Sequence, residues 1–271
     1  MDRKKYLVIL KSVTAVCILA GLYIHVFRYA VPLFRFGTGQ ESKIVSDTVT
    51  FDRIDSVDLD LDVFNVEIKQ GDDYSLSYEC AEHLRPEFRI DEGKLVISDR
   101  KEKNRFFQVG TGLFGKESRM TITLPEDSSL ISLSSETDVG NIRVGDISVG
   151  EAKFEADTGN ISTDGVRATV LTLEADAGNV SVSDSEAKEL NIKTDAGNIS
   201  VDSTSAHQAG VSSDVGNITI NGEFGALTGE TNVGSIDYNC PSDPAENRVS
   251  LTTDVGTIKV NGVDQGSRYS K

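Results

Sequence analysis

Acidic side chains at a fixed spacing are the feature of this sequence with the most potential for chemistry. Asp138, Asp157, Asp176, Asp195 and Asp214 each begin a tetrapeptide D-x-G-N, and neighbouring ones lie 19 residues apart. Stacked as β coils, these carboxylates would form a column with a spacing of ~4.8 Å. Carboxylate oxygens are ligands that Ca²⁺ prefers, so the column is a candidate calcium site.

The same pattern also fits a structural turn. An Asp at the first turn position can accept a hydrogen bond from the N–H two residues on, and the Gly at the third position supplies the positive φ of a type II turn. Repulsion between unit charges at this spacing is only ~0.9 kcal/mol in water. The sequence also lacks the GGxGxD pattern of calcium-binding β-rolls. We therefore expect a structural column, assign no catalytic, cofactor or metal residue, and keep the calcium site as the alternative.

Other motifs that could support catalysis or nucleotide binding are weaker. Residues 110–117, GTGLFGKE, resemble a phosphate-binding loop, but Glu117 stands where a Mg²⁺-binding hydroxyl is needed and a strand, not a helix, is predicted to follow. His83 and His207 lie in no G-x-S-x-G or H-E-x-x-H context. We expect no enzyme, and a carbohydrate-cleaving β-solenoid with paired carboxylates is the least favoured hypothesis.

Two cysteines lie beyond the N-terminal apolar segment, and both follow residues that alternate in polarity. Cys80 comes after Tyr74, Leu76 and Tyr78, whereas Cys240 ends a similar alternation. Both positions predict inward-facing strand residues, so we expect buried free thiols, with a disulfide between them as the alternative.

The D-x-G-N units belong to a longer repeat. Seven related tetrapeptides begin at residues 138, 157, 176, 195, 214, 232 and 254, with spacings of 19, 19, 19, 19, 18 and 22. With the first turn residue as position 0, Gly occupies +2 in all seven, Ile or Val occupies +4, and apolar or small residues predominate at −5, −3 and −1. Alternation with period two predicts strands on both sides of the turn. The fold class is therefore all-β, a single-stranded parallel β-solenoid of ~19-residue coils; a meander of antiparallel hairpins is the alternative.

The repeat also divides the chain into segments. Residues 130–263 form the regular solenoid, and residues 49–129 predict divergent coils that cap it. In that second segment Asp62–Ile68 matches the repeat with Phe64 in the Gly place, Asp91–Ile97 matches more loosely, and residues 120–125 predict one strand. Residues 264–271 are polar and predict a flexible tail.

The N-terminal segment predicts a membrane anchor. Residues 6–27 form a predominantly apolar run in which Lys11 is the one residue with a full charge. As a helix they would span ~33 Å, enough for a bilayer core of ~30 Å. Basic residues are concentrated before this run, so the positive-inside rule places residues 1–5 in the cytoplasm, residues 28–48 as a juxtamembrane linker, and the body outside. A cleaved signal peptide and a lipoprotein attached at Cys17 are the alternatives.

Charge separates the anchor from the body. The chain has a formal net charge of −16, yet residues 1–36 carry six basic residues and one acid, which leaves 21 basic against 42 acidic residues beyond them. This balance excludes a nucleic-acid partner, which requires clustered basic residues. An acidic body attracts cations and cationic peptides; it also simply keeps a protein soluble.

The repeated D-x-G-N-I-x-V units, the segment VDLDLDVFNVEI at residues 57–68 and the element TITLP at residues 121–125 resemble the bacterial "putative adhesin" domain of unknown function. The Lia-type envelope-stress operons of Gram-positive bacteria encode a member with a similar anchor and domain. The resemblance implies a surface β-solenoid and names no functional residues. We therefore expect a non-catalytic module that contacts membrane lipid through its N-terminal helix and binds a protein or polymer of the cell envelope, with an acidic trap for cations or cationic peptides as the alternative.

Overall fold

The computed structural model describes residues 43–98, 118–241 and 247–271. The predicted cytoplasmic residues 1–5, the predicted span 6–27 and most of the predicted linker lie outside these ranges. In the part of the chain that is described, no helix is long and apolar enough to cross a membrane.

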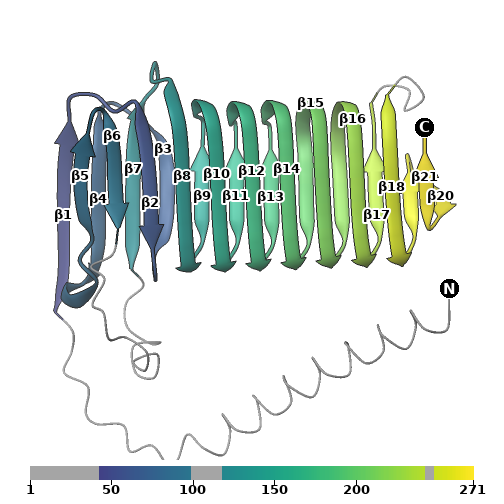
Figure 1. Cartoon of the computed structure of the whole chain (residues 1–271), viewed down its shortest axis with the longest axis horizontal. Helices are drawn as coiled ribbons and strands as arrows, with labels where there is room; N and C mark the ends of the chain where they lie inside the picture. Colours follow the sequence, from purple (N-terminus) through teal and green to yellow (C-terminus); the bar gives the residue numbers. More distant parts are fainter. Residues whose placement is uncertain (1–42, 99–117, 242–246) are drawn as a thin grey trace, which may run out of the picture. The chain divides into compact units, whose positions relative to one another are not determined.

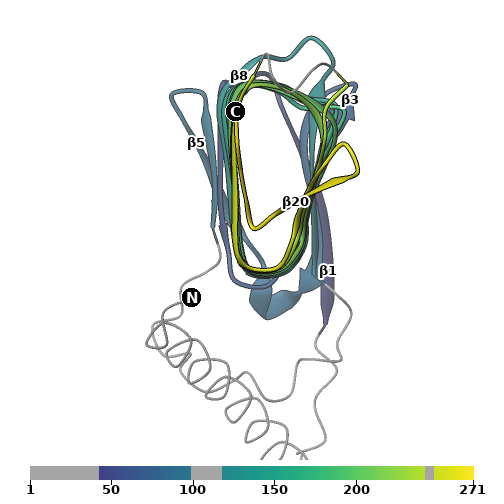
Figure 2. The same cartoon turned by 90° about the vertical axis from the view of Figure 1, so that its right-hand side faces the viewer.

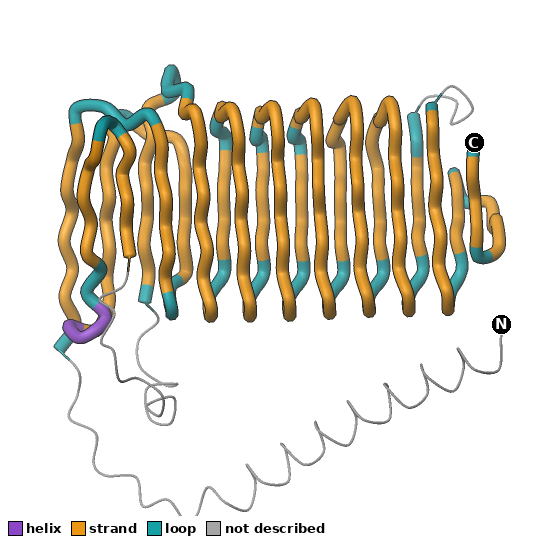
Figure 3. The backbone as a smooth tube through the Cα atoms, in the orientation of Figure 1, coloured by secondary structure: helices purple, strands orange, loops and turns teal. Residues whose placement is uncertain are grey.

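The described body is a stack of β coils (Figure 1). Each regular coil consists of a longer strand, the D-x-G-N turn, a shorter strand and a second bend. The strands of the regular coils are β8 (Leu130–Val139), β9 (Ile142–Gly145), β10 (Ser148–Thr158), β11 (Ile161–Asp164), β12 (Arg167–Ala177), β13 (Val180–Ser183), β14 (Glu186–Ala196), β15 (Ile199–Val215), β16 (Ile218–Val233), β17 (Ile236–Asn239), β18 (Arg248–Val255) and β19 (Ile258–Val260). The long strands β15 and β16 run through the second bend without interruption (Figure 3).

Pairing between coils is parallel and in register with the repeat. Leu171 of β12 lies between Ala152 of β10 and Leu190 of β14, each 19 residues away. The parallel solenoid is therefore confirmed, and the antiparallel meander is wrong. Seen along the stack, the strands superpose as two long walls joined by the bends (Figure 2).

The core fills the space between these two walls. Inward positions of consecutive coils hold identical or similar apolar residues, which form columns of Ile, Val and Leu. One column at position +4 consists of Ile142, Ile161, Val180, Ile199, Ile218, Ile236 and Ile258, each at most 1% exposed. A single coil has no partner for this face, so burial requires its neighbours.

Close approach between coils explains the Gly at position +2. A Cβ on Gly197 would lie 1.8 Å from the carbonyl oxygen of Gly178 in the preceding coil, and the same clash recurs along the stack. The expected type II turn is wrong, because Gly159 has φ 156° and that turn needs φ near +80°. The expected Asx hydrogen bond does not form either, since the N–H of Gly159 donates to the carbonyl of Ala177 at 3.1 Å.

The order of the coils along the stack differs from their order in the chain at the N-terminal end. The strands β2 (Ser56–Leu61) and β3 (Asn65–Gly71) form the predicted coil with Phe64 in the Gly place, and they pair with β8 and β9. On their other side lie β6 (Lys94–Ser98) and β7 (Arg119–Pro125), which occur later in the chain. The coil formed by β2 and β3 is therefore inserted between two coils that follow it in sequence.

The predicted coil over Asp91–Ile97 is wrong. Its turn is a β-hairpin that joins β5 (Glu87–Asp91) to β6 in antiparallel pairing. Glu92 and Gly93 have φ 47° and 81°, and two successive residues with positive φ form the tight turn of a two-residue hairpin.

Antiparallel strands close both ends of the stack. At the N-terminal end, β1 (Ile44–Phe51) pairs with β4 (Tyr74–Ala81), which pairs with β7; β1 begins inside the predicted linker, so that boundary is wrong. A short 3-10 helix, η2 (Glu82–Leu84), follows β4. Across the gap between the walls, Phe51 of β1 contacts Phe88 of β5 edge to face, with ring centroids 6.2 Å apart.

The C-terminal end is closed in the same way. β20 (Val263–Gly266) pairs with β19, and β21 (Arg268–Ser270) pairs with β18, both antiparallel. The predicted flexible tail is therefore wrong. Polarity misled the prediction, because these strands cover the last coil and lie largely at the surface, with only Tyr269 packed on the core.

The contact at the turn Gly makes a direct prediction. Gly197→Ala places a methyl group against a backbone carbonyl that cannot move without breaking the pairing between coils, so we expect a loss of at least about 2 kcal/mol in unfolding free energy. Gly145→Ala is the matched control, because its Cβ would meet no atom closer than 4.0 Å. Urea unfolding monitored by circular dichroism measures both, and equal stability of the two variants would contradict the role of the contact.

Candidate functional site

Two columns of carboxylates run along one wall of the stack. At position −2 the register partners are Asp60, Glu136, Glu155 and Glu174. Two residues further along each strand, at position 0, lie Asp62, Asp138, Asp157 and Asp176. Alternation along a strand turns both positions outward. We call these eight residues the acidic strip.

Partial burial and like charges raise the pKa of two members of the acidic strip. The pKa of Glu136 is raised, first by burial and then by the charges of Glu155 and Asp60. Burial also raises the pKa of Asp138, with further contributions from Asp62 and Asp157. The ionised strip therefore repels itself where its first coils meet.

Lysines neutralise part of the same wall. Lys153 Nζ lies 2.8 Å from Glu155 Oε1, and Lys193 Nζ lies 3.0 Å from Asp195 Oδ1 at the end of the strip. Hydrogen bonds to these carboxylates are the main cause of the raised pKa of each lysine. Over the described ranges, no group of three or more His, Cys, Asp or Glu side chains is arranged to hold a metal ion.

A column of asparagines beside the acidic strip fills the role expected of the aspartates. The backbone N–H of Asn179 donates to Asn160 Oδ1 at 2.9 Å, and its side-chain amide donates to the same oxygen at 3.1 Å. The Oδ1 of Asn179 in turn accepts from the backbone and side chain of Asn198. The sequence predicts this column, because Asn recurs at +3 in five consecutive tetrapeptides and in-register stacking places each Asn beside the next. The aspartates occupy the first position of each turn, and the asparagines form the hydrogen bonds that join the turns of neighbouring coils.

The remaining sequence candidates do not come together. His83 lies in η2 and His207 in β15, both exposed. Cys80 and Cys240 are buried and are not joined in a disulfide, as predicted. The segment at residues 110–117, which resembles a phosphate-binding loop, lies outside the described residues.

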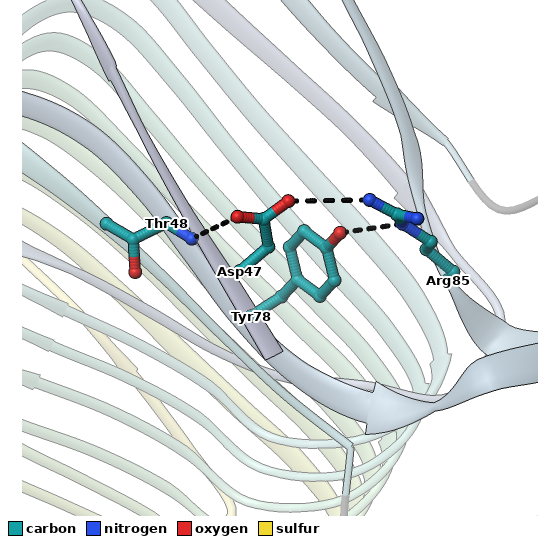
Figure 4. Close-up of polar contacts among 4 residues, drawn as sticks. All are labelled: Asp47, Thr48, Tyr78 and Arg85. Carbon is teal, nitrogen blue, oxygen red and sulfur yellow. Dashed lines mark hydrogen bonds and ion pairs between the residues drawn. The ribbon is translucent and has the colours of Figure 1, made fainter. Parts of the chain in front are cut away.

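Polar contacts fasten the edge strand β1 to its neighbours (Figure 4). Arg85 Nε donates to the hydroxyl of Tyr78 on β4 at 2.9 Å, and Arg85 Nη2 lies 3.4 Å from Asp47 Oδ2 on β1. The other oxygen of Asp47 accepts from the N–H of Thr48. These contacts hold the N-terminal cap together, and no reaction is evident from them.

The family model described as Toastrack DUF4097 matches residues 54–269. The chain belongs to this family. The matched range includes the acidic strip and ends within β21, the last antiparallel strand.

The chain is similar to solved structures, of which the first has the same fold. A "putative adhesin" from Bacteroides fragilis is 22% identical, with a TM-score of 0.59, over 82% of this chain and 100% of that one. A "putative adhesin" from Parabacteroides merdae is 14% identical, with a TM-score of 0.41, over 83% of this chain and 96% of that one. The comparison with curated proteins finds no match. The Bacteroides structure supports the architecture of the Toastrack domain and, at this identity, nothing beyond it.

The raised pKa of Glu136 predicts a pH-dependent stability. A carboxyl group whose pKa is higher in the folded state stabilises the fold at low pH, and this contribution is lost as the pH rises through the raised value. Glu136→Gln should therefore raise the melting temperature at pH 7 and leave it unchanged at pH 3, and added salt should reduce the gain at pH 7.

Glu223→Gln removes the same charge outside the acidic strip and is the control. Melting curves recorded by circular dichroism at the two pH values make the comparison. A gain for Glu136→Gln that is equal at pH 3 and pH 7 would rule out charge repulsion as its cause.

Proposed function

We propose that this Toastrack protein is a membrane-anchored, non-catalytic binding module on the outer side of a bacterial cell envelope. The apolar run at residues 6–27 and the basic residues before it support the anchor and the orientation. Membership of a family whose relatives include "putative adhesins" supports a binding role over an enzymatic one. A link to the envelope-stress response rests on the sequence resemblance alone and belongs to the same proposal.

The observation that carries the binding role is the regularity of the walls. Outward side chains of consecutive coils stand in columns because the coils pair in register, as in the series from Ser148 to Arg167 to Glu186. Fully paired parallel strands make this surface rigid, so a partner meets preorganised groups. Such a surface suits an extended partner that lies along the stack, for example an envelope protein or polymer.

A second candidate function is the capture of cations or cationic peptides by the acidic strip. Its support is specific: carboxylates on four successive coils lie side by side, and Glu136 and Asp138 already have raised pKa values. A cationic ligand would relieve that repulsion. Binding of Ca²⁺ is the weaker form of this proposal, because the stacking of the coils explains the spacing of the turn aspartates without a metal.

The orientation of the body is testable by chemical labelling. We expect a membrane-impermeant amine reagent, added to intact wall-stripped cells, to label Lys188 and Lys259, which are exposed in the solenoid. Lys4 and Lys5, on the predicted cytoplasmic side, should be labelled only after lysis. Mass spectrometry of the recovered chain reads all four sites, and labelling of the solenoid lysines only after lysis would contradict the proposal.

A further inference from the structure

A cleft of about 640 Å³ follows the stack along the second bend. Its floor consists of small or apolar residues that are register partners in five consecutive coils. These floor residues are Val149, Ala168, Ala187, Ala206 and Phe224. Because alanines occupy the three central coils, the floor lies below the longer side chains on either side.

Charged side chains of both signs line this cleft. Arg167 and Lys188 stand on neighbouring coils, and in the described part of the chain neither has a carboxylate within 4.0 Å, unlike Lys153 and Lys193 at the acidic strip. Glu186 is the register partner of Arg167 without forming an ion pair with it. Basic side chains without an ion-pair partner among the described residues are unexpected on a body with such a large excess of acids.

The order of these charges along the stack is fixed. Arg167 and Glu223 occupy the same position three coils apart, through the register partners Glu186 and Ser205. Three steps at ~4.8 Å separate their backbones by about 14 Å. An extended peptide advances ~3.4 Å per residue, so this distance corresponds to about four residues.

The lining favours a peptide over a sugar. Among the described residues that line the cleft, Phe224 is the one Phe, Tyr or Trp, and it is only 2% exposed. A sugar ring would therefore find no exposed Phe, Tyr or Trp face on these residues. Polar and charged groups on both sides of an alanine floor suit an extended backbone with charged side chains.

We propose that this cleft binds an extended polypeptide segment in which an acidic and a basic side chain lie about four residues apart. The acidic side chain meets Arg167 and Lys188, and the basic side chain meets Glu223. The inference rests on the proposed binding function and names the surface and the partner class.

Selection of phage-displayed random decapeptides on the full chain tests this assignment. Enriched peptides should carry an acid and a base three to five positions apart. Glu223→Lys should change the enriched pattern to two acids, and Arg167→Glu combined with Lys188→Glu should change it to two bases. For one enriched peptide, each variant should weaken binding about two- to fivefold per exposed ion pair lost.

Arg143→Glu, Lys259→Glu and Glu230→Lys change exposed charges outside the cleft and are the matched controls. Enrichment that the cleft variants leave unchanged would overturn the proposal, as would enrichment of purely basic peptides that depends on the acidic strip. If the cleft variants still crosslink to envelope material in cells, the cleft assignment alone fails. A full chain that captures neither peptides nor envelope material would remove the proposed function as well.

Discussion

The contact between each turn Gly and the carbonyl of the preceding coil is the constraint on which the rest of the structure depends. Parallel pairing fixes the distance between coils at ~4.8 Å, and at the D-x-G-N turn that distance leaves no room for a side chain: a Cβ on Gly178 would lie 1.7 Å from the oxygen of Gly159. In the regular coils, only Gly at this position allows the turns to stack in register. In-register turns then align the asparagines into a hydrogen-bonded column and the Ile and Val residues into a buried one.

The same stacking creates two needs that the regular repeat does not meet. A stack of parallel strands ends in open edges, which invite further pairing, and antiparallel strands cover the last coils at both ends. Partial burial raises the pKa of Glu136 and Asp138, and the equal charges that the outward columns bring together raise it further. Lys153 and Lys193 reduce this repulsion only in part. The columns of Ile, Val and Asn therefore stabilise the repeat. The columns of carboxylates at the surface carry net negative charge and repel one another.

The parallel solenoid, the coil with Phe64 and the inward residues could be predicted from the sequence. A repeat of 19 residues gives the register between coils directly, because residues 19 apart pair with each other. Sequence reasoning misplaced what depends on contacts between distant segments. The order of β6 and β7 before β2 has no local signal, and the hairpin at Asp91 resembled a repeat turn because both contain an acid followed by Gly. The turn mechanism was also wrong, since the sequence shows a Gly but not the carbonyl that it faces. The cleft beside Arg167 was missed because it follows from small residues aligned across coils.

Removal of one complete coil tests the stacking account most directly. Deleting residues 176–194 joins Ala175 to Asp195 and leaves every remaining Gly facing a carbonyl, whereas deleting residues 176–185 removes about half a coil and breaks the register. We expect the variant without the complete coil to keep cooperative urea unfolding and a β-type circular dichroism spectrum, with an m-value that is smaller in proportion to the surface lost. The variant without half a coil should lose both the cooperative unfolding and the β-type spectrum. Equal behaviour of the two deletions would contradict the stacking account.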